Sequence, residues 1–165
     1  MNYFELFGLP IGFQVDAAKL RQAYMEIQRT SHPDKFTQSS IDDQDIALEK
    51  SAIANKAFTL LNNKEQILPY VLEVMGYMET DEKYALSPDF LMEMMDLNEA
   101  WMDADSEAAK SNVTQQVKTI QNAIYTTVKA ILEANSIDIT KEAMLQVKEY
   151  YYKKKYLDRI LADFR

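Results

Sequence analysis

Branched apolar residues recur in steps of three and four along the stretch from 113 to 131. They are Val113, Val117, Ile120, Ile124, Val128 and Ile131. Residues spaced in this way share one face of an α-helix, so the pattern predicts a long amphipathic helix inside a helical bundle. The whole chain has only 3 Gly and 4 Pro among 165 residues. Sheet proteins need many turns, and this scarcity therefore favours an all-α fold of long helices joined by few loops.

The composition argues against several classes of function. A formal net charge of −8 does not suit nucleic-acid binding, which requires clustered Lys and Arg to neutralise phosphates. The absence of Cys and the single His argue against a transition-metal site and a Cys nucleophile. No apolar run is long enough to cross a bilayer, and the start of the chain lacks the features of a secretory signal. We therefore expect a cytoplasmic protein without bound cofactor, metal, membrane or nucleic acid.

Two helices near the start of the chain are predicted to form an antiparallel hairpin. The first begins behind Asp16, which suits an N-cap, and ends near Ser31, because Pro33 disfavours helical angles at the residue before it. The second begins among acids that suit a helix start, and 32–40 is the loop between the two helices. The expected inward stripe of the second helix is Ala47, Ser51, Ala54, Phe58 and Leu61.

The chain is predicted to divide near its middle. A short helix after Asn62-Asn63 should bury Leu68, Val71, Leu72 and Met75. Residues 76–86 contain a Gly and several acids without helical period, and Ser87-Pro88 then has the pattern of an N-cap followed by Pro at the first helical position. Helices are expected at about 87–104, 108–134 and 139–164. We therefore predict a helical hairpin domain over 1–75, a linker over 76–86 and a three-helix bundle over 87–165, with diverging axes and an elongated, L-like shape.

The first helix of the predicted bundle has two apolar faces. At about 100° per residue, one face carries Phe90, Met94, Leu97 and Trp101, which suits a bundle core. The other side carries Leu91, Met95 and Met102, flanked by Met92, Asp96, Glu99 and Asp103. An exposed apolar patch bordered by acids is typical of a partner surface, and Met adapts to irregular contacts. The alternative is that this second face packs against the rest of the chain or against a dimer mate.

The tripeptide His32-Pro33-Asp34 lies in the predicted hairpin loop. Pro33 fixes one backbone torsion, Asp34 offers a carboxylate to a partner's Arg, and His32 can donate or accept a hydrogen bond. By itself the tripeptide could be a simple helix-terminating turn. Its context includes Tyr3-Phe4-Glu5-Leu6-Phe7-Gly8-Leu9-Pro10, Tyr24, Gln28, Lys35-Phe36, Ala54-Asn55-Lys56-Ala57-Phe58 and Leu60-Leu61. Together these residues resemble a J-domain, and "YFELFGLP" with "HPDKF" resembles the HscB family of co-chaperones.

This resemblance implies a co-chaperone of iron–sulfur cluster assembly that has no catalytic chemistry of its own. Such a protein stimulates the ATPase of a DnaK-type (HscA-like) chaperone and brings it an IscU-like scaffold protein. Carried over to this chain, the chaperone-binding residues would be His32, Pro33, Asp34, Lys19, Arg21, Arg29 and Lys35. The scaffold-binding residues would be Leu91, Met92, Met95, Asp96, Glu99, Asp103 and Tyr156.

Two other functions remain open at this stage. A generic J-domain co-chaperone with a different client would need the tripeptide but not the second apolar face. A non-catalytic helical interaction scaffold would need neither.

Tyr156 could equally be an ordinary half-buried tyrosine. The chain also departs from the family pattern around Lys64, Ile67-Leu68-Pro69 and Tyr70, where only the Tyr is kept, and this puts the packing of the third helix against the fourth in question.

Overall fold

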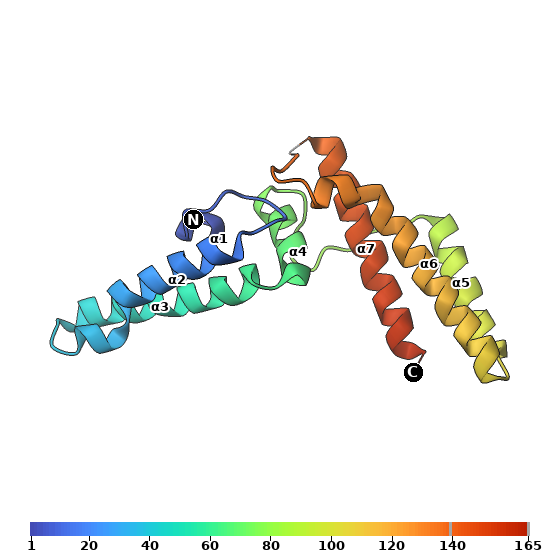
Figure 1. Cartoon of the computed structure of the whole chain (residues 1–165), viewed down its shortest axis with the longest axis horizontal. Helices are drawn as coiled ribbons and strands as arrows, with labels where there is room; N and C mark the ends of the chain where they lie inside the picture. Colours follow the sequence, from blue (N-terminus) through green and yellow to red (C-terminus); the bar gives the residue numbers. More distant parts are fainter. Residues whose placement is uncertain (139, 165) are drawn as a thin grey trace. The chain divides into compact units, whose positions relative to one another are not determined.

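The computed structural model describes residues 1–138 and 140–164, and every regular element in these ranges is a helix (Figure 1). The predicted all-α class is therefore confirmed. The chain separates into two compact units: Met1–Val74 with Asn135–Ile137, and Met75–Ala134 with Asp138–Arg165. Among the helices of the described ranges, none combines the length and apolar character needed to span a membrane.

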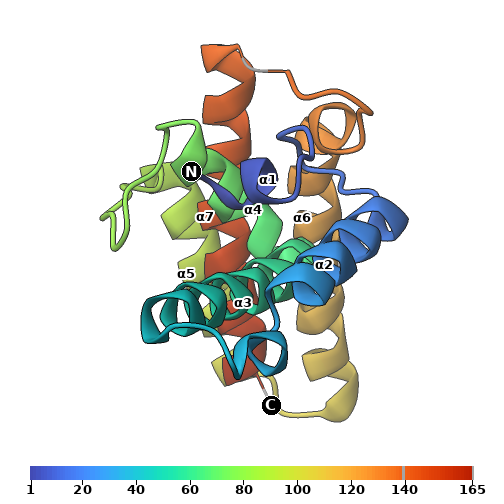
Figure 2. The ribbon, with the colours of Figure 1, turned by 90° about the vertical axis from the view of Figure 1, so that its left-hand side faces the viewer.

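The first unit is built on a hairpin of α2 (Ala17–Ser31) and α3 (Ile41–Leu61), which lie side by side in both views (Figures 1 and 2). Asp16 caps α2 as predicted, because its carboxylate accepts the N–H groups of Ala18 and Lys19. The N-cap of α3 is Ser40, whose hydroxyl accepts the N–H of Asp43. The acids expected at the start of α3 therefore lie in its first turn, where they complement the helix dipole.

Two short helices complete the first unit. Helix α1 (Tyr3–Leu6) is held by a capping box between Asn2 and Glu5, and it inserts the fully buried Phe4 into the core. Helix α4 (Lys64–Val74) buries Ile67, Val71 and Leu72. The predicted stripe of this helix was wrong at two positions: Leu68 is only half-buried, and Met75 lies beyond the last turn. The buried face is shifted by one residue toward Ile67, four positions before Val71.

The second unit is a bundle of α5 (Pro88–Asp103), α6 (Glu107–Leu132) and α7 (Lys141–Asp163). Its core cluster contains Phe90, Met94, Leu97, Val113, Val117, Leu157, Ile160 and Phe164. The apolar seam predicted on α6 is buried at Val113, Val117 and Val128, but it continues at Leu132 and leaves Ile131 half-buried. Because an α-helix has 3.6 residues per turn, the step of four brings Leu132 back under Val128.

A polar cluster attaches part of 76–86 to the second unit. The carboxylate of Glu82 lies 2.8 Å from Nζ of Lys148 and accepts the hydroxyl of Tyr152 at 3.1 Å. The ring of Tyr84 stacks on that of Tyr152 with a centroid separation of 4.5 Å. The segment predicted as a linker therefore contributes side chains that pack on α7. The division into domains over 1–75 and 87–165 remains a prediction.

Candidate functional site

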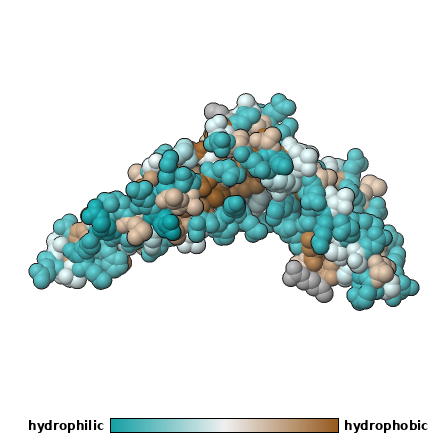
Figure 3. Space-filling model, in the orientation of Figure 1, coloured by the Kyte–Doolittle hydropathy of each residue, from teal (hydrophilic) through white to brown (hydrophobic). Residues whose placement is uncertain are grey.

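The loop that follows α2 presents its polar side chains to solvent. Helix α2 stops at His32, whose backbone ψ of 135° is extended, and Pro33 opens the 3₁₀ turn η1 (Pro33–Phe36). The side chains of His32 and Asp34 are 49% and 89% exposed. The end of the hairpin is coloured mainly as hydrophilic in Figure 3. The predicted tripeptide is thus a surface feature and not a buried turn.

The tripeptide is locally ordered by its own hydrogen bonds. Nδ1 of His32 accepts the backbone N–H of Asp34 at 3.2 Å, and the carbonyl of His32 accepts the N–H of Lys35 at 3.0 Å. Oδ2 of Asp34 lies 3.5 Å from the same Nδ1. These contacts involve Nδ1, so the other ring nitrogen, Nε2, and the exposed Asp34 carboxylate remain available to a partner.

Hydrogen bonds between polar side chains join α2 to α3. Gln28 accepts the hydroxyl of Ser51 at 2.8 Å and donates its amide to Asn55 at 3.1 Å. Tyr24 also donates to Asn55, and its ring stacks on that of Phe58 at 4.4 Å. This network fixes the register of the two helices, and with it the place at which the loop leaves α2. The sequence marked Tyr24 and Gln28 only through the family resemblance.

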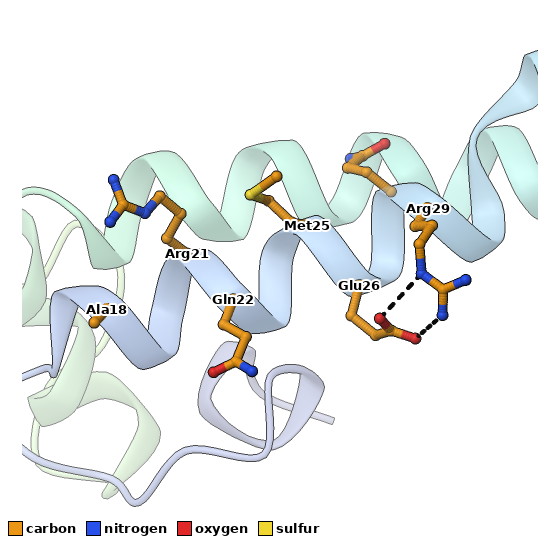
Figure 4. A pocket seen from close by; sticks show the side chains of 7 residues that line it. Ala18, Arg21, Gln22, Met25, Glu26 and Arg29 are labelled. Carbon is orange, nitrogen blue, oxygen red and sulfur yellow. Dashed lines mark hydrogen bonds and ion pairs between the residues drawn. The ribbon is translucent and has the colours of Figure 1, made fainter.

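The four cations predicted for chaperone binding are all exposed, but they do not share one face. Arg21 and Arg29 are eight residues apart and line the same shallow depression on α2 (Figure 4). Lys19 lies two residues before Arg21, which places it on roughly the opposite side of the helix. Lys35 belongs to the loop. The basic surface is therefore formed by Arg21 and Arg29 along α2, with Lys35 in the neighbouring loop and Lys19 apart from them.

The depression on α2 contains two residues that the sequence analysis did not single out as contacts. Met25, midway between Arg21 and Arg29, is 61% exposed. Glu26 pairs with Arg29 through two contacts of 2.6 and 3.2 Å (Figure 4). The hydrogen bonds from Arg29 hold the pKa of the Glu26 carboxyl below its ordinary value. An exposed pair of this kind contributes little to stability, so Arg29 can exchange Glu26 for an acid of a partner at small cost.

Helix α5 in the second unit positions the other predicted site. Its start is set by Ser87, whose hydroxyl accepts the N–H of Phe90, and by Pro88 at the first helical position. Phe90, Met94 and Leu97 are buried, as the apolar spacing predicted. Trp101 is partly buried and stacks on Phe164, the residue that follows α7, at 4.5 Å. These contacts pack α5 against the other helices of the bundle.

The opposite side of α5 carries exposed methionines among acids. Met92 and Met95 are 63% and 66% exposed, and Leu91 is half-buried. The predicted acids Asp96, Glu99 and Asp103 are also exposed. The structure therefore brings these six predicted residues onto one accessible helix face, which is not covered by the described part of the chain.

Tyr156 of α7 lies half-buried at the edge of the bundle core. Its ring meets the ring of Phe90 edge-on at 6.1 Å, and the guanidinium of Arg159 lies 5.0 Å from its centroid. Phe90 directly precedes Leu91, so Tyr156 contacts the helix that carries the exposed face. These contacts give Tyr156 a structural role and also leave part of its ring accessible beside that helix.

The sequence of this chain matches proteins of known family. Residues 86–165 match the family described as HSCB C-terminal oligomerisation domain. The Co-chaperone protein HscB homolog of Vibrio atlanticus (strain LGP32) is 33% identical over 162 residues, which cover 97% of this chain and 92% of the relative. The chain belongs to the HscB family of co-chaperones. The Iron-sulfur cluster co-chaperone protein HscB of Homo sapiens is 33% identical over 152 residues, which cover 90% of this chain and 64% of the human protein.

Solved HscB structures share the fold over almost the whole chain. The crystal structure of human co-chaperone protein HscB superposes with a TM-score of 0.71 at 30% identity, covering 99% of this chain and 80% of the human chain. Chaperone HscB from Vibrio cholerae gives a TM-score of 0.64 at 28% identity, covering 99% and 95% of the two chains. The family membership therefore rests on both sequence and structure.

Despite the departure from the HscB pattern, α4 contacts α3 and is joined to α1 by Tyr70. The hydroxyl of Tyr70 accepts the backbone N–H of Tyr3 at 2.8 Å, and the two rings stack at 5.0 Å. Desolvation by burial raises the pKa of the Tyr70 phenol above its ordinary value. Pro69 is the sixth residue of α4 and removes one backbone donor. The retained Tyr thus ties α4 to α1.

Proposed function

We propose that this HscB family member binds an IscU-like iron–sulfur scaffold protein through α5 and delivers it to a DnaK-type, HscA-like chaperone through the loop at His32-Pro33-Asp34. The chaperone then hydrolyses ATP faster, while the co-chaperone itself has no catalytic role. The observation that carries the proposal is the pairing, in one HscB chain, of an exposed, ordered loop with an exposed apolar and acidic helix face. The proposed place of action is the cytoplasm, where a DnaK-type chaperone and ATP are available.

The loop supports the chaperone half of the proposal by its shape and chemistry. Asp34 presents an almost fully exposed carboxylate, which can pair with an Arg of the chaperone. Arg21 and Arg29 supply positive charge along α2 for an acidic surface of the same partner. The loop is fixed by the hydrogen bonds of His32, so little ordering is needed when the chaperone binds.

The α5 face supports the scaffold half of the proposal. Met92 and Met95 offer flexible apolar side chains that adapt to a protein surface. The acids beside them favour a partner surface on which apolar residues are bordered by Lys or Arg. When both sites are occupied, tethering raises the local concentration of the scaffold at the chaperone without any new contact.

The deciding experiment measures ATP hydrolysis by the organism's DnaK-type chaperones with this protein, with the scaffold protein, and with both. The proposal expects stimulation by the co-chaperone alone and a larger, synergistic stimulation with the scaffold. It would be contradicted if the scaffold added nothing to the stimulation. ATP turnover by this protein alone would instead indicate an enzyme.

Two variants assign the roles to the two surfaces. His32→Gln should abolish stimulation and leave scaffold binding unchanged, with Ser39→Ala in the same loop as the control. The triple change of Leu91, Met92 and Met95 to Ala should abolish scaffold binding and leave basal stimulation unchanged. Scaffold binding by the triple variant at the original affinity would favour a generic J-domain co-chaperone with another client. Full stimulation by His32→Gln would favour a purely structural scaffold.

A further inference from the structure

Met102 extends the apolar stripe of α5 beyond Met95, the last apolar residue among the proposed scaffold contacts. It lies seven residues after Met95 and eleven after Leu91, spacings that return to the same side of a helix. Its side chain is 82% exposed, more than that of Met92 or Met95. Single exposed apolar residues are ordinary, but aligned ones on a rigid helix form a surface. Leu91, Met95 and Met102 therefore make one stripe that runs along most of α5.

The last turn of α5 is fixed from its other side. Trp101, the residue before Met102, stacks on Phe164 with an interplanar angle of 7°. The ammonium of Lys110 lies 5.4 Å from the centroid of the Trp101 ring. Helix α5 ends only after Asp103. Met102 is therefore presented from an ordered turn and not from a frayed end, so its contacts require little ordering of the backbone.

The surroundings of Met102 have the same charge as those of Met92 and Met95. Glu99, Asp103 and Asp105 are exposed near it in the chain. From Pro88 to Asp103 the helix carries five acids and no Lys or Arg. An apolar side chain in such a field suits a partner surface where an apolar patch is bordered by basic residues. The scaffold protein that is proposed to bind Leu91 and Met95 therefore also suits Met102.

We propose that Met102 is a further contact for the iron–sulfur scaffold protein, about two turns beyond Met95, the last apolar residue of α5 carried over from the family. The inference rests on the proposed function and deepens it. The scaffold then lies along the stripe as far as the last turn of α5, and Met102 inserts into an apolar site near the end of the interface.

The test is the affinity of the purified apo scaffold protein for four full-length variants. Met102→Ala should weaken binding by about 3- to 10-fold, the effect of a secondary interface contact. Met102→Leu, which keeps the apolar volume, should bind as the original chain does. The paired change of Met92 and Met95 to Ala tests the proposed function itself. Leu145→Ala removes another exposed apolar side chain, 43% exposed, from the first turns of α7 and should have no effect.

The outcomes separate the two proposals. Original affinity for Met102→Ala, with weakened binding by the Met92 and Met95 variant, overturns the role of Met102 and leaves the proposed function standing. Original affinity for both overturns the proposed function. Equal weakening by Leu145→Ala would show a nonspecific effect and also overturn the role of Met102. Because Met102 is so exposed, its variants should melt at the original temperature.

Discussion

Glu82 contacts two residues that are far away in the sequence. Its carboxylate contacts Lys148 and Tyr152 of α7, and the Lys148 ammonium also lies 5.7 Å from the centroid of the Tyr84 ring. The Lys148 side chain is only 13% exposed. A nearly buried ammonium requires a partner, so the loss of Glu82 would leave it partly desolvated and unpaired.

Glu82→Gln should lower the melting temperature at neutral pH. The hydrogen bond from Lys148 holds the pKa of the Glu82 carboxyl below its ordinary value. A lowered folded-state pKa means that the stabilisation is present above the ordinary pKa, about 4.5, and is lost as the pH falls through the folded-state value. Melting curves followed by circular dichroism should therefore differ most at neutral pH and converge in acid. Glu79→Gln, at an exposed carboxylate three residues earlier, is the control, and a pH-independent difference would contradict the explanation.

Asp34→Asn should lower chaperone stimulation by at least about tenfold, because an amide cannot form the charge-assisted pair with an Arg. The side chain is 89% exposed, so the melting temperature should stay within about a degree. The measurement is steady-state ATP hydrolysis by the chaperone at saturating co-chaperone. Unchanged stimulation would show that the exposed carboxylate is not a contact.

Two neighbouring residues of α5 allow a role in folding to be tested separately from a role in binding. Met94 is fully buried in the bundle core, while Met95 is 66% exposed. Both are methionines on the same turn of the same helix, so they form a matched pair whose chemistry is identical and whose surroundings differ.

Met94→Ala should reduce the free energy of unfolding by about 2–4 kcal/mol, the usual loss for a large-to-small change in a core. Met95→Ala should change it by less than about 0.5 kcal/mol but weaken scaffold binding. Urea denaturation measures the first quantity and calorimetric titration the second. A large loss of stability in Met95→Ala would indicate that the exposed face packs within the protein.

The acids of α5 should make scaffold association sensitive to salt. Raising the ionic strength from about 0.05 M to about 0.5 M shortens the screening length severalfold and should slow association. The double change of Asp96→Asn and Glu99→Gln should reduce this dependence, which stopped-flow measurements can follow. A rate that does not respond to salt would contradict the charge complementarity invoked for this face.

The two proposed sites belong to one chain, and the proposed delivery depends on that linkage. In the proposed function each surface binds its own partner, and synergy arises only if one molecule holds both partners at once. The family that residues 86–165 match is described as an oligomerisation domain. Oligomerisation would be a second way to bring a loop and an α5 face together, from two different chains.

Mixing two defective variants tests this linkage in the whole molecule. His32→Gln retains the scaffold surface, and the triple Ala change at Leu91, Met92 and Met95 retains the loop. If delivery occurs through a single chain, the mixture should give less than about a tenth of the original synergy, because tethering is lost. The readout is chaperone ATP hydrolysis with scaffold present. Restored synergy would indicate that separate chains cooperate.

Helix boundaries were largely predictable because their causes are local. Asp16 and Ser87 cap the helices that follow them, and Pro33 ends α2 where expected. The hydrogen bond between Tyr3 and Tyr70 joins residues 67 positions apart, and the cluster at Glu82 joins residues 66 and 70 apart. No periodicity marks such pairs, since periodicity reports only the neighbours on one helix. Lys19 is a different case: its spacing of two residues from Arg21 already places it on the other side of the helix, and only the family resemblance grouped it with Arg21 and Arg29.

The amino-acid sequence alone determined where helices start and stop, which residues share a helix face, and that the chain resembles HscB. These properties follow from backbone sterics, capping and the 3.6-residue turn, all of which act over a few neighbouring residues. Only the tertiary structure decided whether the second apolar face of α5 is covered. Helical spacing placed Met94 on the core face, but it did not determine whether another segment packs over Met95, which is exposed. Exposure depends on whether a distant segment packs over a residue, and that is settled only when the helices assemble.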